Sequence, residues 1–204
     1  MRPADARAVT LAALREEAQG CRRCPLWKGT NGCVFGEGPD DARMMVVGEQ
    51  PGHEEDLAQK PFVGPSGAVL DEAMAEAGID RARVYVTNAV KHFKFVKRGK
   101  RRLHQKPTAG EIDACKWWLD QEIGLIRPAT IVMLGATAVR GVTGCAGAIG
   151  KLRGHPVALD QGRAVATYHP AYILRQPDRE ASKAAYAALV ADFRLASQTA
   201  SAPG

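Results

Sequence analysis

The chain has 204 residues, of which 46% are hydrophobic and 25% are charged, and its formal net charge is +6. These values are ordinary for one globular domain and exclude a disordered chain, and no apolar run approaches the length of a membrane span. The positive charge favours an anionic partner.

The first 20 residues contain acids and no long apolar run, so we expect no secretory signal and a cytosolic protein. In that compartment, five cysteines are expected to bind metal, react or lie buried rather than form disulfides. Residues 5–18 predict an amphipathic helix, because Leu11 and Leu14 share one face.

Four short apolar runs further along are typical of strands, and helical patterns alternate with them. The strands are expected over residues 44–47, 84–90, 130–134 and 164–168, and helices over 66–77, 108–123, 135–142 and 179–196. Residues 51–67 are rich in proline and glycine and are expected to be largely loop. The alternation predicts one three-layer α/β/α domain over residues 1–204, with a four-stranded parallel sheet and a frayed tail from residue 198.

The most basic stretch, KHFKFVKRGKRRLHQKP at residues 91–107, holds eight Lys or Arg and no acid. We expect it to stay out of the apolar core and to lie along phosphates, whose neutralisation releases counterions. His104 would then be held against nucleic acid as a base, donor or nucleophile. A solvated loop whose histidine has no role explains the stretch alone equally well. The candidate DNA contacts are Lys94, Lys97, Arg98, Lys100, Arg101 and Arg102.

Polar residues follow three expected strands at their carboxyl ends. Glu49 and Gln50 follow the first strand, Asn88 lies near the end of the second, and His169 follows the fourth. The carboxyl ends of parallel strands share one edge of a sheet, where functional groups gather. These side chains are therefore expected to form one site.

Four motifs resemble those of the uracil-DNA glycosylase superfamily, specifically its iron–sulfur family 4 branch. They are GEQPGHEED (48–56), PFVGPSG (61–67), TNAVKH (87–92) and HPAYILR (169–175). GEQPG together with KRRLHQKP resembles the UdgX subgroup, which bonds covalently to uracil-containing DNA. The resemblance covers nearly the whole chain from Cys21 onward. It implies that the partner is uracil-containing DNA, either single- or double-stranded, and that the protein is a monomer.

The resemblance assigns roles in flipping and excising uracil. Phe62 would stack on the flipped ring, Asn88 would read its O4/N3 edge against cytosine, and His169 would donate to O2 as negative charge develops there. Arg175 would hold phosphate or the wall of the site. The structural alternatives are that Phe62 is a core aromatic residue and that Asn88 caps a turn. Likewise, His169 could belong to a plain His-Pro turn, and Arg175 could be a solvated arginine.

The same resemblance implies that His104 captures C1′ of the sugar cation, so that each protein acts once. Glu49 would accept from one imidazole nitrogen and leave the other free to attack, unless it only accepts from loop amides. Gln50 would contact the base or the basic stretch, and Asp56 would position a water or support that stretch. His53 stands where the subgroup tends to have another polar residue, often an acidic one, so the resemblance assigns it no water-activating role.

Cys21 and Cys24 form a close ligand pair, and Cys115 lies early on a capped helix. The resemblance implies a structural [4Fe–4S] cluster and makes His92 the fourth ligand, where family 4 enzymes have a cysteine. Zinc accepts the same donors, and Cys33 is a rival ligand because it follows Cys24 closely.

Three other functions stay open. The first is a conventional family 4 glycosylase that turns over. The second is a non-catalytic iron–sulfur module that binds DNA and senses redox state. The third is a glycosylase for another lesion, such as hypoxanthine or a damaged pyrimidine. Release of uracil, and a DNA adduct that survives boiling, are the observations that separate them.

Overall fold

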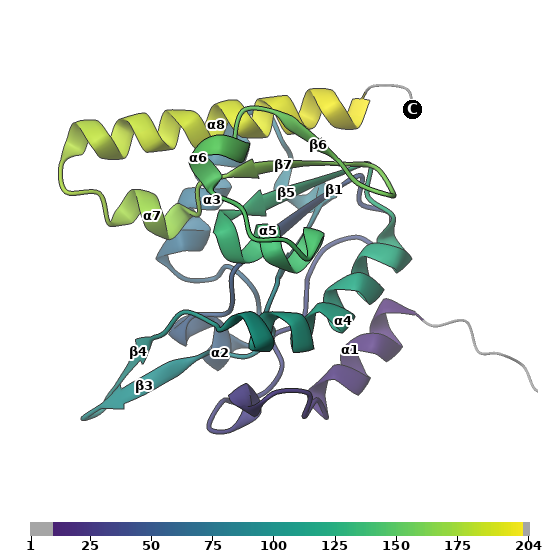
Figure 1. Cartoon of the computed structure of the whole chain (residues 1–204), viewed down its shortest axis with the longest axis vertical. Helices are drawn as coiled ribbons and strands as arrows, with labels where there is room; N and C mark the ends of the chain where they lie inside the picture. Colours follow the sequence, from purple (N-terminus) through teal and green to yellow (C-terminus); the bar gives the residue numbers. More distant parts are fainter. Residues whose placement is uncertain (1–9, 202–204) are drawn as a thin grey trace, which may run out of the picture.

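The fold is a mostly parallel sheet between two layers of helices, seen in a computed structural model that describes residues 10–201 (Figure 1). The strands are β1 (Met44–Gly48), β2 (Val84–Asn88), β3 (Phe95–Arg98), β4 (Arg101–His104), β5 (Thr130–Leu134), β6 (Pro156–Ala158) and β7 (Arg163–Thr167). The central sheet has the order β2-β1-β5-β7-β6; β6 runs antiparallel to β7, and the other neighbours are parallel. β3 and β4 form a separate antiparallel pair, called the basic hairpin below.

Helices cover both faces of the sheet. They are α1 (Leu11–Gln19), α2 (His53–Ala58), α3 (Pro65–Glu76), α4 (Ala109–Ile126), α5 (Gly135–Thr143), α6 (Ile149–Leu152), α7 (Pro170–Leu174) and α8 (Arg179–Ser201), with single 3-10 turns η1 (Pro25–Trp27) and η2 (Arg81–Arg83). α3 and α8 pack on one face, α4 and α5 pack on the other, and α1 lies against α4 (Figure 1). No described helix combines the length and the apolar character that a membrane crossing needs. The three layers are those that the alternation of strands and helices predicts.

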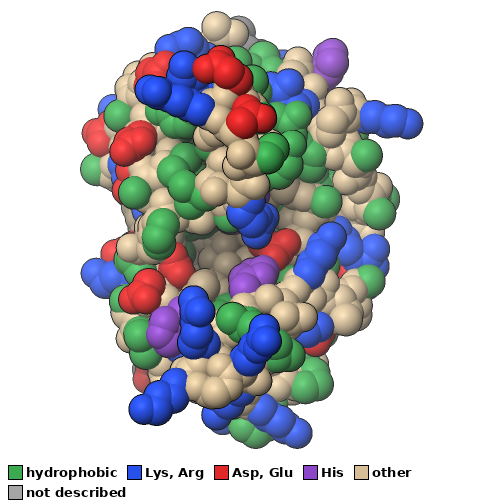
Figure 2. Space-filling view, turned by 90° about the vertical axis from the view of Figure 1, so that its left-hand side faces the viewer, with side chains coloured by type: hydrophobic (Ala, Val, Ile, Leu, Met, Phe, Trp, Pro, Cys, Tyr) green, Lys and Arg blue, Asp and Glu red, His purple; other side chains and the backbone are tan. Residues whose placement is uncertain are grey.

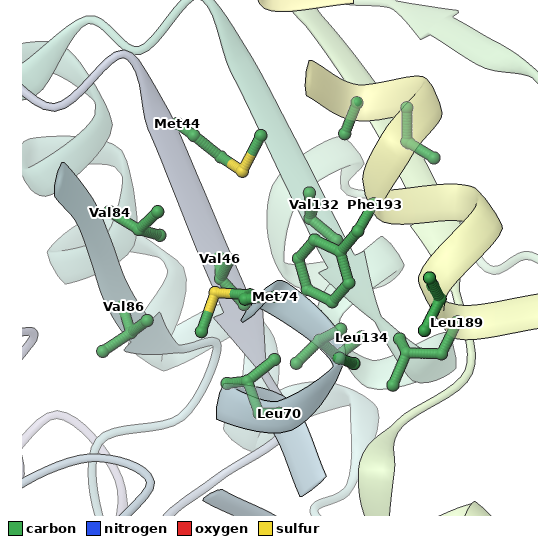
Figure 3. Close-up of a cluster of buried hydrophobic side chains, with 14 of the residues drawn as sticks. Met44, Val46, Leu70, Met74, Val84, Val86, Val132, Leu134, Leu189 and Phe193 are labelled. Atoms are coloured by element: carbon green, nitrogen blue, oxygen red, sulfur yellow. The ribbon is translucent and has the colours of Figure 1, made fainter. Parts of the chain in front are cut away.

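The core has two apolar layers because every residue of β1 is buried. Val46 packs in the same cluster as Phe193 of α8 and Met74 of α3 (Figure 3), whereas Val47 packs in the other cluster with Leu119 of α4. Successive side chains of a strand point to opposite faces, so a strand covered on both sides consists of apolar residues throughout. This burial holds the carboxyl ends of β1, β2, β5 and β7 at one edge.

The prediction of a four-stranded sheet is wrong by one strand. The four predicted strands are present and parallel, and β6 extends the sheet beside β7. β6 has only three residues, of which Val157 alone is partly buried, so it lacks the apolar run that marked the other strands. Pro156 fits this position because proline is tolerated at the first residue of an edge strand.

Residues 51–67, expected to be largely loop, contain α2 and the beginning of α3. Gly52 and Gly64 occupy the N-cap positions of these helices, where glycine is tolerated but gives a weaker signal than serine or aspartate. α4 begins at the predicted capping box of Thr108 and Glu111.

The two ends of the chain differ from the expectation as well. The last helix continues to Ser201, five residues beyond the predicted end at residue 196. Residues 202–204 lie outside the described residues, as do residues 5–9 of the predicted first helix.

The basic stretch of residues 91–107 enters the core at its start, which contradicts the expectation that it stays outside. Lys91, His92 and Phe93 are each at most 2% exposed. Lys91 can be buried because Glu122 neutralises its charge. The remainder forms the basic hairpin, whose outer residues are exposed.

Truncating the core beneath α8 should destabilise the whole domain. Phe193 is 0% exposed, so Phe193→Ala is expected to lower the free energy of unfolding by about 3–5 kcal/mol. Urea denaturation measures the loss. Leu57→Ala, at a side chain that is 56% exposed, is the control and should change stability by less than about 0.5 kcal/mol. Equal losses in the two variants would contradict this assignment of the core.

Candidate functional site

A cavity of about 300 Å³ lies at the carboxyl edge of the sheet. Figure 2 shows a hollow in this side of the molecule, with lysine and arginine side chains gathered around it. Seven of the residues predicted for the site line the cavity, namely Glu49, Gln50, Phe62, Asn88, His104, His169 and Arg175. Gly52, Glu55, Ser66 and Ala171 complete the lining. The expectation that the strand ends converge is therefore confirmed for β1, β2 and β7.

Two glycines let the ring of Phe62 approach the amide of Asn88. A Cβ atom on Gly48 would lie 2.4 Å from Asn88 Oδ1 and 2.5 Å from Phe62 Cζ. A Cβ atom on Gly67 would lie 1.9 Å from the carbonyl oxygen of Phe62. Phe62 itself has a φ of 58°, an uncommon conformation for an aromatic residue that its surroundings must enforce. The aromatic face and the amide are thus held at one end of the cavity.

His169 presents a fixed N–H group. Its Nδ1 accepts a hydrogen bond of 3.1 Å from the backbone N–H of Ala171 at the start of α7. Nδ1 therefore lacks a proton, and the neutral ring carries its proton on Nε2. Burial, together with smaller effects of Arg175 and His104, lowers the pKa of His169 from 6.5 to about 4. The ring is neutral near pH 7 and can donate one hydrogen bond into the cavity.

His104 ends β4, and its half-exposed ring lies between two polar side chains from the end of β1. Its Nε2 is 2.8 Å from Gln50 Nε2 and 3.3 Å from Glu49 Oε1. Partial burial lowers the pKa of His104, Glu49 opposes this shift, and Arg175 adds to it. Thr137 of α5 donates to Glu49 Oε2 at 2.7 Å and so fixes the carboxylate.

The carboxamide of Gln50 fastens the basic hairpin to the sheet. Its Oε1 accepts from the backbone N–H of Lys94 at 2.9 Å, and its Nε2 donates to the backbone carbonyl of Gln105 at 2.9 Å. These two residues lie at the two ends of the hairpin, where the N–H of Gln105 also donates to the carbonyl of Lys94. Gln50, which is 7% exposed, therefore determines where the hairpin leaves the domain.

Arg102 ties the middle of the hairpin to α2. Its guanidinium donates to Asp56 Oδ2 at 2.6 Å and to His53 Nδ1 at 3.0 Å, and it lies over the rings of Phe93 and Phe95. Asp56 is 0% exposed and does not line the cavity, so of its two predicted roles the geometry favours support of the hairpin. The predicted DNA contact of Arg102 stays a prediction, and in the structure its guanidinium contacts Asp56 and His53.

The other lysine and arginine side chains of the basic hairpin fall into two groups, one paired with a carboxylate and one exposed. Lys94 Nζ donates to Glu111 at 2.8 Å, which leaves it largely committed to that carboxylate. The residues near the turn are exposed, and these are Lys97, Arg98, Lys100 and Arg101. The turn of the hairpin is thus the part that carries charge available to an anionic partner.

Two of the predicted metal ligands, Cys21 and Cys115, belong to the apolar cluster between α1 and α4. Cys21, His92 and Cys115 are buried, and Cys24 is partly buried. Burial raises the pKa of Cys115 to about 12 against the opposing effect of Lys91, with smaller upward effects of Cys24 and Cys21. Cys33 is also buried in this cluster and so remains a rival ligand.

Hydrogen bonds already serve two of these sulfur atoms. Cys21 Sγ accepts from Trp118 Nε1 at 3.1 Å, and Cys115 Sγ accepts from the backbone N–H of Lys91 at 3.2 Å. Burial lowers the pKa of His92 to about 4, so its imidazole is in the neutral form that ligates metals. Soft thiol donors and a neutral imidazole fit an iron–sulfur cluster in their chemistry.

The donors are not arranged around a single ion. Among the described residues, no three His, Cys, Asp or Glu side chains form a group that could hold one metal ion. The arrangement of these donors therefore does not select between zinc and an iron–sulfur cluster, and the cluster stays a prediction.

Several residues that support the site were not predicted from the sequence. Gly48 and Gly67 act through the space they leave, and they belong to the GEQPGHEED and PFVGPSG motifs respectively. Glu55 accepts from the backbone N–H groups of Gly52 and Gly64 at 3.0 and 2.9 Å, and so joins the loops on either side of α2. Thr137 lies far from Glu49 in the sequence, so no local pattern could reveal their contact.

Comparisons with known proteins agree on one family. The family model described as the uracil DNA glycosylase superfamily matches residues 35–194. The chain is 40% identical over 167 residues to the type-4 uracil-DNA glycosylase of Thermotoga maritima, covering 81% of this chain and 83% of that protein. It is 35% identical over 177 residues to the type-4 uracil-DNA glycosylase of Pyrobaculum aerophilum, covering 83% and 87%. A type-5 uracil-DNA glycosylase of Pyrobaculum aerophilum is 30% identical over 182 residues, covering 81% and 77%.

The lowered pKa of His169 should make the domain less stable in acid. Between about pH 6.5 and 4 the unfolded chain protonates this ring while the folded chain does not, so the free energy of unfolding falls as the pH drops. His169→Asn, which keeps an acceptor for the N–H of Ala171, should flatten this dependence by roughly 1–3 kcal/mol. Urea titrations at a series of pH values measure it. An unchanged slope in the variant would show that His169 titrates as in the unfolded chain.

Proposed function

The chain belongs to the uracil DNA glycosylase superfamily, and on that premise we propose that it excises uracil from DNA in the cavity at the carboxyl edge of the sheet. One observation carries the proposal: the ring of Phe62, the amide of Asn88 and the N–H of His169 line the same cavity. They supply a stacking face, a donor and acceptor pair, and a neutral donor. These are the groups that a flipped pyrimidine needs.

The cavity selects the substrate by size and by hydrogen bonding. A volume of about 300 Å³ accepts a single base and excludes a base pair, so the nucleotide must leave the stack first. The side chain of Asn88 can donate to O4 and accept from N3–H of uracil. Cytosine has an amine in place of O4 and no hydrogen on N3, so it leaves both groups of the amide unpaired.

Bond cleavage places negative charge on the departing base. The C1′–N1 bond breaks with its electron pair on uracil, and the sugar becomes an oxocarbenium-like cation. A donor already in place stabilises the charge on O2 without reorganisation. The Nε2–H of neutral His169 is that donor, and the lowered pKa of its ring keeps the proton state constant over the physiological range.

We further propose that His104 captures the sugar cation. The lone pair of one imidazole nitrogen forms a bond to C1′, and the proton on the other nitrogen leaves the resulting imidazolium, with Glu49 as the neighbouring acceptor. The support is that His104 lines the cavity and that its lowered pKa keeps the ring unprotonated near pH 7. Imidazole is a poor leaving group from C1′, so the protein would act once.

A conventional glycosylase that turns over is the second candidate. The similarity to type-4 uracil-DNA glycosylases favours it. Glu49, fixed by Thr137 at the cavity wall, would then hold the water that captures C1′. In this case His104 would shape the mouth of the cavity and leave no bond to the sugar.

We propose that Cys21, Cys24, His92 and Cys115 hold a [4Fe–4S] cluster. The group would supply structural support by joining the chain that follows α1 to α4 and to the segment that leads into the basic hairpin. Lys97, Arg98, Lys100 and Arg101 would contact the phosphates of single- or double-stranded DNA from the exposed turn of that hairpin.

Denaturing gels with a uracil-containing oligonucleotide test the capture step. The wild type should give a shifted band that survives boiling, and His104→Gln should abolish it by removing the nucleophile. His155→Gln is the matched control, because His155 is exposed and its Nδ1 lies beside the backbone carbonyl of Arg153, away from the cavity residues. It should cross-link at the wild-type rate.

One result would reject the covalent adduct, and another would reject the glycosylase activity itself. Abasic DNA with no shifted band would reject the adduct and favour the enzyme that turns over. Absence of both uracil release and a shifted band on every substrate would reject the glycosylase itself.

Metal content tests the cluster. The purified protein should be brown, with a broad visible absorption band and bound iron, because three thiolates and a histidine ligate iron. Cys115→Ser should lose most of the iron, whereas Cys145→Ser should keep it. Cys145 is exposed and lies outside the apolar cluster between α1 and α4. A colourless protein that contains zinc would overturn the cluster.

A further inference from the structure

Lys91 is the most deeply buried cation in the described part of the chain, and no step of the proposed excision uses it. We propose that Lys91, with Glu122 as its charge partner, is a positioning residue that fixes the main chain of Asn88 and thereby the place of the amide that contacts uracil. This inference rests on the proposed function, because it concerns how Asn88 reads the base.

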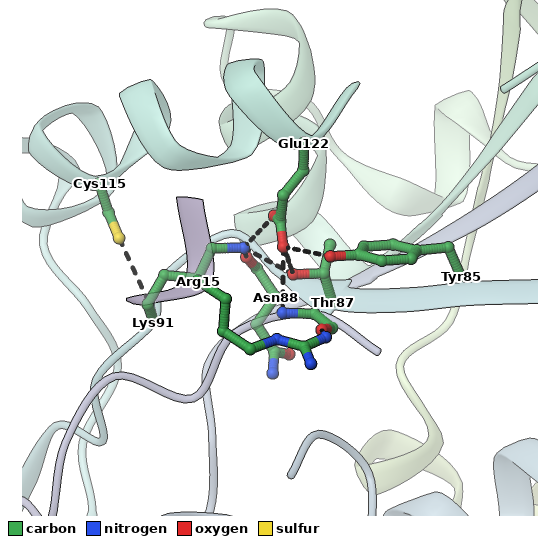
Figure 4. A network of polar contacts seen from close by, with 8 residues as sticks. Arg15, Tyr85, Thr87, Asn88, Lys91, Cys115 and Glu122 are labelled. Atoms are coloured by element: carbon green, nitrogen blue, oxygen red, sulfur yellow. Dashed lines mark hydrogen bonds and ion pairs between the residues drawn. The ribbon is translucent and has the colours of Figure 1, made fainter. Parts of the chain in front are cut away.

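The ammonium of Lys91 binds the main chain beneath the cavity (Figure 4). Its Nζ donates to the backbone carbonyl of Asn88 at 2.8 Å, to Thr87 Oγ1 at 2.6 Å and to the carboxylate of Glu122. Both charged side chains are 0% exposed. The three donors of the ammonium therefore have three acceptors, one of which is the peptide group of the proposed base reader.

The contact lies where the regular pairing of β1 with β2 ends. That pairing stops at Gly48 and Asn88, and beyond it the N–H groups of Ala89 and Val90 donate to the carbonyls of Gly48 and Glu49. Lys91 Nζ supplies a donor to the carbonyl of Asn88 at the point where the strand ends. The orientation of the Asn88–Ala89 peptide, from which the amide side chain projects, is thereby fixed on both sides.

Lys91 is itself held in place by its own main chain. Its N–H donates to Cys115 Sγ at 3.2 Å, and its carbonyl accepts from the N–H of Val34 at 2.9 Å. Its side chain then reaches back by three residues to Asn88, so the loop between them is closed by a buried ionic contact. A closed loop of this kind leaves little freedom for the peptide at Asn88.

Glu122 is the only buried carboxylate that contacts Lys91 among the described residues, and neutral donors complete its shell. Tyr85 Oη donates to it at 2.9 Å, the backbone N–H of Gly36 at 3.0 Å and Thr87 Oγ1 at 3.0 Å. A buried ion pair is often no more stabilising than apolar side chains of the same volume. The proposed role of the Lys91–Glu122 pair beneath the cavity is to fix the orientation of the peptide group of Asn88.

The side chain of Asn88 has little tolerance for movement. Its Oδ1 approaches Gly48 so closely that a Cβ atom there would lie 2.4 Å away. A shift of about 1 Å at a positioned group can reduce an enzymatic rate by about 100-fold. Release of the carbonyl of Asn88 should therefore lower uracil excision far more than it lowers the stability of the fold.

The test is whether Lys91 acts through Asn88. Lys91→Met combined with Glu122→Gln removes the ion pair together, so that no buried charge is left alone, and the new amide can still serve Tyr85 and Gly36. The rate of uracil release is measured with enzyme in excess, in the wild-type background and in an Asn88→Ala background. Lys116→Met, at a partly exposed ion pair on the same helix as Glu122, is the control and should change neither rate.

Coupling is the expected result. The paired substitution should slow release about 10- to 100-fold when Asn88 is present and less than about threefold when it is alanine. An equal loss in the two backgrounds would show that Lys91 only supports the fold and would overturn the inference. Wild-type protein that releases no uracil would instead reject the proposed function, so the two failures are distinguishable.

A milder variant carries the same test if the paired substitution prevents folding. Thr87→Val keeps the volume of the side chain and removes one oxygen that holds Lys91 Nζ. It should slow uracil release about three- to tenfold with Asn88 present, and less than about twofold in the Asn88→Ala background. Equal losses in both backgrounds would again overturn the inference.

Discussion

The carboxamide of Gln50 is the contact on which the site depends. It joins the end of β1 to both ends of the basic hairpin through the backbone of Lys94 and Gln105. β1 lies inside the sheet and is buried on both faces, so this end of the strand cannot move without disturbing the core. A hairpin fixed to such a strand places His104 reproducibly, although most of its own residues are exposed. Arg102 adds a second fixed point through the buried carboxylate of Asp56.

The electrostatics of the cavity keep the imidazoles of His104 and His169 neutral. The proposed roles use this state differently, because one ring donates a hydrogen bond and the other supplies a lone pair. Burial and the charge of Arg175 lower the pKa of both His104 and His169. A neutral His169 with its proton on Nε2 is a donor suited to a departing anion. A neutral His104 has a lone pair suited to the sugar cation that remains. Protonation would add a charge beside Arg175 and would remove the lone pair, so one electrostatic environment serves both proposed roles.

Much of this arrangement follows from local sequence patterns, and the rest depends on contacts between distant residues. The four parallel strands, the capping box at Thr108 and the meeting of Glu49, Asn88 and His169 follow from apolar runs and from the geometry of parallel sheets. β6 is too short to show such a pattern. Basic character alone cannot separate Arg102, which is paired with a buried Asp56, from the exposed Arg101, because the partner lies 46 residues away. The burial of Lys91 is hidden for the same reason, since Glu122 lies 31 residues away.

Mass spectrometry of the protein after reaction with a uracil-containing oligonucleotide tests the central claim most directly. After digestion of the protein and the DNA, the peptide that contains His104 should gain the mass of a deoxyribose 5′-phosphate remnant, and fragmentation should place that mass on the imidazole. An unmodified His104 peptide from protein that has released uracil, or the added mass on another residue, would contradict the proposal that this ring captures the sugar.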